Sequence, residues 1–140
     1  MDYAIIAAGE GSRLVEEGVT TPKPLVRLLG EPMIDRLMGL FLRHGATSIS
    51  VIVNEEMTDV QHHMEQLALP VPLNLVVRST PSSMHSFHAL RPFLTSDTCC
   101  LTTVDTVFRE EPFAAYIDAF ERSPLLDGMM AVTAYVDDEA

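Results

Sequence analysis

The sequence predicts an α/β fold, in which helices cover both faces of a mostly parallel, doubly wound sheet in a Rossmann-like three-layer arrangement. Three observations support this prediction. Apolar segments of strand length alternate with segments of helical periodicity along the chain. The apolar segments are continuous, as expected of parallel strands that are buried on both faces. Clusters of polar residues follow directly after three of them, which is typical of a sheet whose carboxyl edge forms a binding site.

The strand-like segments are short, and polar residues, glycines or prolines separate them. The first, Tyr3–Ala7, is wholly apolar, and the segment at residues 48–53 is rich in β-branched side chains. The expected strands are residues 3–7, 48–53, 73–77, 98–104 and 129–136, with a shorter extended piece at residues 25–29.

Helical spacing accounts for the segments in between. Ile34, Leu37, Met38 and Phe41 recur at intervals of three and four residues, so they form one apolar face of a helix that Gly45 ends. Further helices are expected at residues 55–67, at residues 83–90, and from residue 112 to about residue 120.

Length and charge limit the classes of function. A chain of 140 residues with 47% apolar content can bury one core, so we expect a single domain over residues 1–140. Nine basic against twenty acidic side chains give a net charge of −11, which argues against a nucleic-acid binder with a basic face. No apolar run reaches the ~20 residues that cross a bilayer, and no secretory signal is expected at the start of the chain. We therefore expect small-molecule ligands and no membrane partner, while the oligomeric state is not predicted.

The two cysteines, Cys99 and Cys100, are neighbours in an expected strand. Neighbouring side chains on a strand point to opposite faces, so this pair predicts no disulfide framework. Both are expected to be small core residues of a protein in the reducing cytoplasm.

The loop after the first expected strand carries the densest polar chemistry in the chain. Its sequence is Ala7-Ala8-Gly9-Glu10-Gly11-Ser12-Arg13-Leu14, and Pro22-Lys23-Pro24-Leu25 follows further along. The two glycines let the backbone turn sharply and bring N–H groups close to an anion. Ser12 adds a hydroxyl, Arg13 a planar fork of donors suited to phosphate, and Lys23 a point charge. These residues predict a polyphosphate-binding loop; the alternative is a surface turn with unrelated basic residues.

The loop fits neither of two common phosphate-binding motifs. A dinucleotide fingerprint needs a small residue three positions after the second glycine, where this chain has Leu14. A P-loop needs Gly-Lys and then Ser or Thr after four spacer residues, and the chain has no such run. The stretch from residue 6 to residue 25 instead resembles, nearly letter for letter, the signature of the sugar-1-phosphate nucleotidyltransferases, A-A-G-x-G-[ST]-R-[LM] followed by P-K-[PAV]-L.

This resemblance implies a fold of the nucleotide-diphospho-sugar transferase type and a nucleotidyl transfer reaction of EC class 2.7.7. A phosphate oxygen of a phosphorylated acceptor, a sugar 1-phosphate in this family, attacks the α-phosphorus of an NTP, and pyrophosphate leaves. Because the acceptor phosphate is already an anionic nucleophile, catalysis can come from positioning and charge neutralisation.

The resemblance also implies roles for individual residues. Arg13 would stabilise the β- and γ-phosphates and Lys23 the charge that grows at the α-phosphoryl group, so both are the expected catalytic residues. The residues expected to bind the donor nucleotide are Ala8, Gly9, Gly11 and Ser12 in the loop, together with Ser82 and Ser83, which stand where relatives have a short turn that contacts the nucleoside. The last two serines could equally cap the next helix, and the two roles are compatible.

Asp105 follows an apolar segment, where an unpaired carboxylate would be costly to bury. A cation would compensate its charge, and Mg²⁺ typically takes one or two protein carboxylates and leaves its other positions to water and phosphate oxygens. The resemblance is to the family's strand-end aspartate that holds the catalytic Mg²⁺, although Val104 stands where many relatives have glycine. As the alternative, Asp105 caps the following turn.

Other functions stay open at this point. The acceptor could be phosphocholine or another alcohol phosphate, which would make the protein a cytidylyltransferase of a different substrate class, or the molybdopterin cofactor, whose transferases usually lack the arginine and the P-K-P-L segment. The chain could also be a non-catalytic nucleotide-binding homologue. Because relatives are longer, residues 1–140 are expected to be the N-terminal portion of a larger family domain, with the second metal ligand further along and little turnover on their own.

Overall fold

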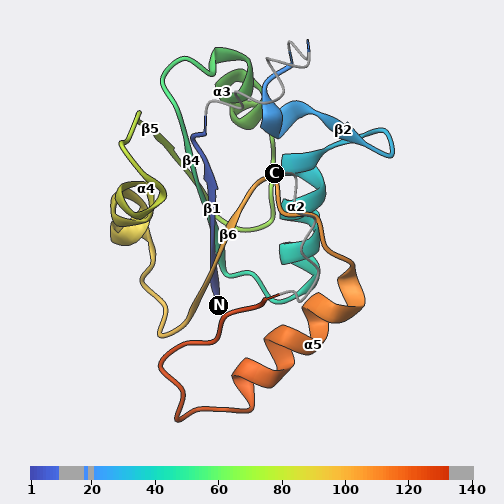
Figure 1. The fold of residues 1–140 in the computed structure, drawn as a ribbon, viewed down its shortest axis with the longest axis vertical. Coiled ribbons are helices and arrows are strands. Elements are labelled where there is room, and N and C mark those ends of the chain that lie inside the picture. The colour runs from blue at the N-terminus through green and yellow to red at the C-terminus, as the bar shows by residue number, and fades with distance from the viewer. Residues whose placement is uncertain (10–17, 19–20, 133–140) are drawn as a thin grey trace, which may run out of the picture. The chain divides into compact units, whose positions relative to one another are not determined.

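The structure, a computed structural model, describes residues 1–9, 18 and 21–132 of the chain (Figure 1). The chain divides into two compact units, Met1–Thr106 and Val107–Ala140, and each is considered by itself. No helix in the described part of the chain is long and apolar enough to cross a membrane.

The first unit is built on a four-stranded parallel sheet with the strand order β5-β4-β1-β6. The strands are β1 (Asp2–Ala7), β4 (Ser48–Val53), β5 (Leu73–Val77) and β6 (Cys99–Thr103). All residues of the two central strands, β1 and β4, are buried, which explains why most of them are apolar. β6 lies at an edge of the sheet and has exposed and buried residues, with Cys99 exposed and Cys100 buried.

Helices cover both faces of this sheet (Figure 1). Helices α2 (Met33–Arg43) and α3 (Thr58–Glu65) lie side by side, joined by a 2.6 Å contact between His63 Nε2 and Asp35 Oδ1. Helix α4 (Ser83–Leu90) packs against β1 and β4 on the opposite face. The order of the strands requires this arrangement, because right-handed crossovers that run in opposite directions along a sheet place their helices on opposite faces.

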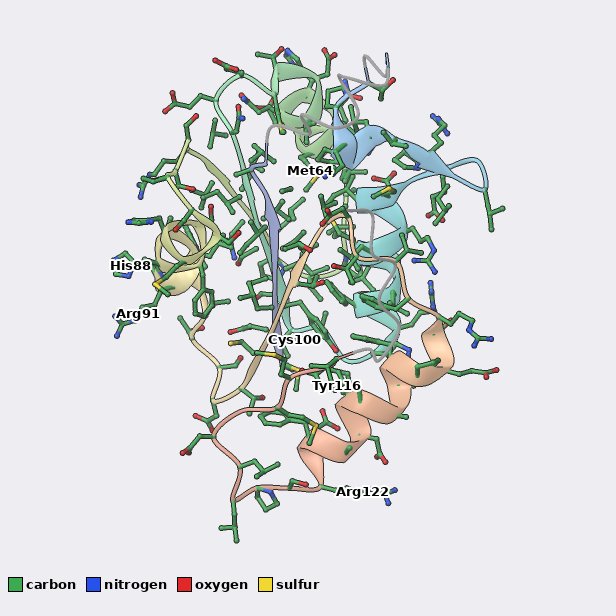
Figure 2. All side chains as sticks on the ribbon, in the orientation of Figure 1. Met64, His88, Arg91, Cys100, Tyr116 and Arg122 are labelled. Atoms are coloured by element: carbon green, nitrogen blue, oxygen red, sulfur yellow. The ribbon has the colours of Figure 1, made fainter. Side chains whose placement is uncertain are left out.

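Successive residues of β1 supply both halves of the core. Tyr3 faces α2, where its ring stacks on Phe41 with the ring centroids 4.2 Å apart. Ala4 and Ile6 point the other way and pack in one cluster with Leu90 of α4. On the α2 side, Met64 of α3 is also buried, and Figure 2 labels it between the two helices and the sheet.

Asp2 is a carboxylate buried at the start of β1, and it is fully provided with donors. The hydroxyls of Ser48 and Thr47 donate to Oδ1 at 2.6 and 3.0 Å, and the backbone N–H of Ser96 donates to Oδ2 at 2.8 Å. Burial raises the pKa of this carboxyl, but these hydrogen bonds outweigh burial and lower the pKa to about 2. Asp2 therefore ties together the starts of β1, β4 and the segment that leads into β6.

A small hairpin separates the first loop from α2. Lys23–Leu25 form a 3₁₀ turn, and β2 (Arg27–Leu28) then pairs antiparallel with β3 (Glu31–Pro32). The two residues at its tip, Leu29 and Gly30, both have positive φ, 53° and 85°, as a type I′ turn requires. Gly30 accepts this conformation at no steric cost, whereas Leu29 does not, and its side chain is 99% exposed.

The second unit contains α5 (Glu110–Glu121) and the segment that follows it. Phe108 stacks on Phe113 at the start of the helix, and the Tyr116 hydroxyl donates to the Met129 carbonyl at 2.5 Å. These contacts fold the chain back on the helix.

The predicted fold class is confirmed, and several predicted element bounds need correction. Residues 25–29 are not one extended piece but run from the 3₁₀ turn through β2 to the hairpin tip. The helix expected from residue 55 begins at Thr58, and Cys99 is not a core residue. Residues 55–57 form a turn because the Asn54 side chain accepts the Glu56 N–H at 2.7 Å, which competes with helix. Residues 129–132 are not a strand, and the rest of the expected strand at 129–136 lies outside the described residues.

Candidate functional site

The four parallel strands end at the same edge of the sheet, and polar segments follow each of them. Ala8 and Gly9 follow β1, Asn54 follows β4, and Asp105 comes after β6. Residues 78–82 connect β5 to α4. The sheet therefore gathers at one edge the three polar features that the sequence placed after strands, as expected for a doubly wound sheet.

The start of the first loop, at Ala8 and Gly9, and the turn at residues 79–83 line one open pocket of about 520 Å³ on the side of α4. Its floor is the end of β1, and its walls come from the ends of β4 and β5 and the first turn of α4. The lining residues are Ile6, Ala8, Gly9, Asn54, Glu56, Ser79, Thr80, Pro81, Ser82, Ser83 and Ser86. Five of these eleven residues are serine or threonine, and among the eleven only Glu56 carries a charged side chain. Such a pocket suits the neutral part of a ligand that can both donate and accept hydrogen bonds.

The start of α4 is held by hydroxyl groups that also face the pocket. Ser82 is the N-cap of α4, since its Oγ accepts the N–H of His85 at 3.4 Å, and it also contacts His85 Nδ1 at 2.7 Å. Thr80 Oγ1 lies 2.6 Å from Ser86 Oγ and donates to the Ser82 carbonyl at 3.2 Å. The predicted capping role of Ser82 is therefore confirmed, and it coexists with a position on the pocket wall.

Asn54 is a pocket residue that the sequence analysis missed. It is 7% exposed, its Oδ1 accepts the Glu56 N–H, and its Nδ2 donates to the Ala8 carbonyl at 3.5 Å. The side chain thus links the end of β4 to the start of the first loop. Its position directly after an expected strand, like that of Asp105, was the signal that could have found it.

On the other side of β1, Lys23 and Asp105 form an ion pair across 82 residues of sequence, with Lys23 Nζ 3.3 Å from Asp105 Oδ2. β6 pairs directly with β1, and the Val104 N–H donates to the Ile6 carbonyl at 3.1 Å, which places Asp105 beside the end of β1. Both side chains are partly exposed, by 29% for Lys23 and 49% for Asp105. Partial burial raises the pKa of the Asp105 carboxyl, but hydrogen bonds from Thr103 and Lys23 and the lysine charge outweigh it and lower the pKa below its usual range.

The 3₁₀ turn explains how Lys23 reaches Asp105. Pro22 and Pro24 restrict the backbone on both sides of Lys23, and the N–H groups of Leu25 and Val26 close the turn on the carbonyls of Pro22 and Lys23 at 2.9 and 3.1 Å. The P-K-P-L segment is therefore a rigid turn that presents the chain's single lysine beside the end of β6.

Gly9 has open space around it among the described residues. The residue is exposed, its φ lies outside the left-handed region, and a Cβ built on it would meet no atom of the described residues within 4 Å. Such open space is consistent with the close approach of a ligand to the backbone.

The predicted site residues therefore fall into three groups. Ala8, Gly9, Ser82 and Ser83 line the pocket, and Lys23 and Asp105 form the ion pair. Gly11, Ser12 and Arg13 lie outside the described residues.

The chemistry of Asp105 fits a hard divalent cation. Its carboxylate is favoured in the ionised form and is about half exposed, so it can offer oxygen to a cation that keeps water and phosphate ligands. No group of three or more histidine, cysteine, aspartate or glutamate residues that could hold a metal occurs in the described part of the chain. One carboxylate suits a Mg²⁺ ion that arrives with phosphate ligands better than a closed structural site.

Parts of this chain are similar in sequence to curated proteins. The chain is 28% identical over 127 residues to the bifunctional protein GlmU of Thermodesulfovibrio yellowstonii, which covers 89% of this chain and 26% of GlmU. It is 29% identical over 85 residues to the glucose-1-phosphate cytidylyltransferase of Salmonella typhimurium, which covers 51% of this chain and 33% of that enzyme.

The fold also occurs in solved structures. The inositol-1-phosphate CTP transferase of T. maritima superimposes with a TM-score of 0.66 at 22% identity, over 78% of this chain and 45% of that chain. This likeness shows the fold. The chain thus spans between about a quarter and about half of the length of these proteins.

A family model matches nearly the whole chain and not only its N-terminal loop. The model described as the MobA-like NTP transferase domain matches residues 3–138, from the first strand past the last described residue. The chain belongs to the MobA-like NTP transferase domain family.

Proposed function

We propose that the protein transfers a nucleotidyl group from an NTP to a phosphorylated small molecule, most simply a sugar 1-phosphate. The observation that carries this proposal is the pairing of a hydroxyl-lined pocket with the Lys23–Asp105 ion pair on the two sides of the β1 end. Between them lies the start of the loop whose sequence is typical of the family, at Ala8 and Gly9.

The distribution of charge supports one orientation of the donor. None of the described residues that line the pocket is basic, so this part of the pocket suits the base and ribose rather than the triphosphate. Lys23 offers a positive charge on the other side of β1, and Arg13 follows Gly9 in the loop. The nucleoside would therefore lie against Ser82, Ser83 and Asn54, and the phosphates would extend over Gly9 toward Lys23.

The reaction needs no protein base. An oxygen of the acceptor phosphate forms a bond to the α-phosphorus, the bond from that phosphorus to the bridging oxygen of the β-phosphate breaks, and the electron pair leaves with pyrophosphate. Lys23 and Arg13 would stabilise the negative charge that shifts onto the α-phosphoryl group and the leaving pyrophosphate. Asp105 would hold Mg²⁺, which, when bound, neutralises phosphate charge.

The proposal extends to the acceptor, the donor nucleotide and the cellular compartment. A curated relative named as a glucose-1-phosphate cytidylyltransferase supports a sugar 1-phosphate acceptor and makes CTP the first donor to test. We place the protein in the cytoplasm, where Cys99 and Cys100 would stay reduced. Residues 1–140 would act as a single nucleotidyltransferase domain that supplies the N-terminal, donor-binding portion of the longer family domain.

The direct test is the release of pyrophosphate. The protein, both as this chain and within any longer form, is incubated with Mg²⁺, one NTP at a time and a panel of sugar 1-phosphates, phosphocholine and inositol 1-phosphate. We expect pyrophosphate and an NDP-sugar, identified by mass spectrometry, with one preferred NTP. Tight NTP binding without turnover on any acceptor, in the longer form as well as in this chain, would instead make the protein a non-catalytic nucleotide-binding homologue.

A further inference from the structure

Lys23 occupies the carboxylate that the proposed function assigns to a metal ion. Its ammonium group lies 3.3 Å from Asp105 Oδ2, and Thr103 also donates a hydrogen bond to this carboxyl. Asp105 is thus neutralised by the chain's single lysine, which a proline-flanked turn holds in place.

An ammonium group and a divalent cation compete for such a carboxylate. Lys23 contacts Oδ2 of Asp105, and two positive groups on one carboxylate repel each other, so a cation that binds this carboxylate competes with Lys23. The pair itself is partly exposed, and pairs of this kind are held only weakly. A cation can therefore replace Lys23 on Asp105, but the competition with the lysine weakens the binding of the cation.

We propose that Lys23 occupies the cation site in the nucleotide-free protein and leaves it when the donor binds. The triphosphate supplies a new anionic partner for the lysine and further oxygen ligands for the cation, so both groups gain when they separate. The proposal rests on the proposed function, because it takes Asp105 as the metal ligand. It adds that the protein binds the cation weakly on its own and that Lys23 is delivered to the phosphates by this exchange.

The geometry suits such an exchange. Lys23 needs no backbone movement to leave Asp105, because a lysine side chain has four rotatable bonds and its ammonium carries three donors. The 3₁₀ turn keeps the base of the side chain fixed beside the end of β6. The same turn therefore serves both positions of the ammonium group.

The test is the binding of Mn²⁺, measured by electron paramagnetic resonance on the full chain without nucleotide. We expect Lys23→Met to bind Mn²⁺ about tenfold more tightly than the unchanged protein, since one competing charge is gone. Lys23→Arg keeps the charge and should bind like the unchanged protein. Arg91→Met is the matched control, because it removes one exposed positive charge at the end of α4, where Figure 2 labels it, and should change nothing.

Asp105→Asn separates this inference from the proposed function. Combined with Lys23→Met, it should abolish the gain in Mn²⁺ affinity. If Lys23→Met binds Mn²⁺ no more tightly than the unchanged protein, while Asp105→Asn weakens binding in the presence of CTP, the exchange is wrong and the metal assignment stands. If Asp105→Asn changes Mn²⁺ binding neither with nor without CTP, both the exchange and the metal role of Asp105 are overturned.

Discussion

At the scale of single residues, the proposed function assigns Gly9 and Lys23 to the ligand rather than to the fold. A Cβ at position 9 would meet no atom of the described residues within 4 Å, and Lys23 is a partly exposed residue whose ammonium group contacts Asp105. Substitutions at these positions should therefore spare the fold and affect binding or chemistry.

Gly9→Ala should leave the thermal stability within a few tenths of a kcal/mol and weaken NTP binding by about tenfold. The added methyl group has room in the protein but would stand between the loop backbone and a phosphate. Thermal unfolding and calorimetric titration with NTP measure the two effects. Loss of stability with unchanged NTP affinity would show that Gly9 serves the fold.

Lys23→Met should lower the rate of nucleotidyl transfer by roughly 10²–10³, as expected for loss of one preorganised charge at the reacting phosphates. The measurement is single-turnover release of pyrophosphate at saturating NTP, so that weaker binding does not enter. Arg91→Met, with the same change in charge, should retain the rate. A Lys23→Met protein with full activity would remove Lys23 from the catalytic residues.

At the level of elements, the structure depends on a few local devices at the ends of helices and turns. Ser82 caps α4, and Leu29 takes a left-handed conformation in the β2–β3 hairpin. The cap stabilises the protein and the left-handed leucine destabilises it, so substitution of Ser82 should lower the stability and substitution of Leu29 should raise it.

Ser82→Ala should destabilise the protein by about 1 kcal/mol, because the first turn of α4 loses its cap. Urea denaturation measures this change. The neighbouring Ser83→Ala is the control, since the structure gives no capping hydrogen bond from Ser83. Equal losses in the two variants would contradict the assignment of Ser82 as the cap.

Leu29→Asn should stabilise the protein by up to about 1 kcal/mol. Asparagine adopts the left-handed region more readily than leucine, and no packing is lost because the Leu29 side chain is 99% exposed. The measurement is again urea denaturation. A loss of stability would indicate that Leu29 makes contacts that this exposed position does not suggest.

A comparison of the predicted and observed elements shows which bounds can be predicted from the sequence. Strand β5 and helix α4 begin and end where their composition and flanking residues indicated, because proline and serine mark their limits in the sequence itself. Helix α3 starts later than predicted because Asn54 diverts the backbone into a turn, a contact between a side chain and the backbone that periodicity does not reveal. For the site, the order of strands and helices predicted that Asp105 and the turn at residues 79–83 lie at the carboxyl edge of the sheet, while their roles stay predictions. The pairing of Asp105 with Lys23 joins residues 82 positions apart and needed the three-dimensional fold.

For the first unit of the molecule as a whole, Asp2 links stability to pH. Its pKa is about 2 in the folded protein and 3.8 as an ordinary value, so the ionised form is favoured by folding. The stabilisation is about 2 kcal/mol above pH 4 and is lost as the pH falls from about 4 to about 2.

Asp2→Asn should therefore be about 2 kcal/mol less stable than the unchanged protein at pH 7, and the difference should shrink below pH 4. Urea denaturation at several pH values between 7 and 2.5 measures this difference. Asp97→Asn, at an exposed position close to Ser96, is the control and should show no such dependence. A difference that stays constant down to pH 2.5 would contradict the role assigned to the Asp2 charge.

The central claim is that this edge of the sheet binds the donor nucleotide with the help of a cation on Asp105. The most direct measurement is calorimetric titration of the chain with CTP, UTP, dTTP, ATP and GTP, with and without Mg²⁺, repeated on Asp105→Ala. We predict micromolar binding that prefers one base, strengthens with Mg²⁺ and weakens when Asp105 is lost. A folded protein that binds none of these nucleotides, or binds them equally well without Asp105 and Mg²⁺, would contradict the claim.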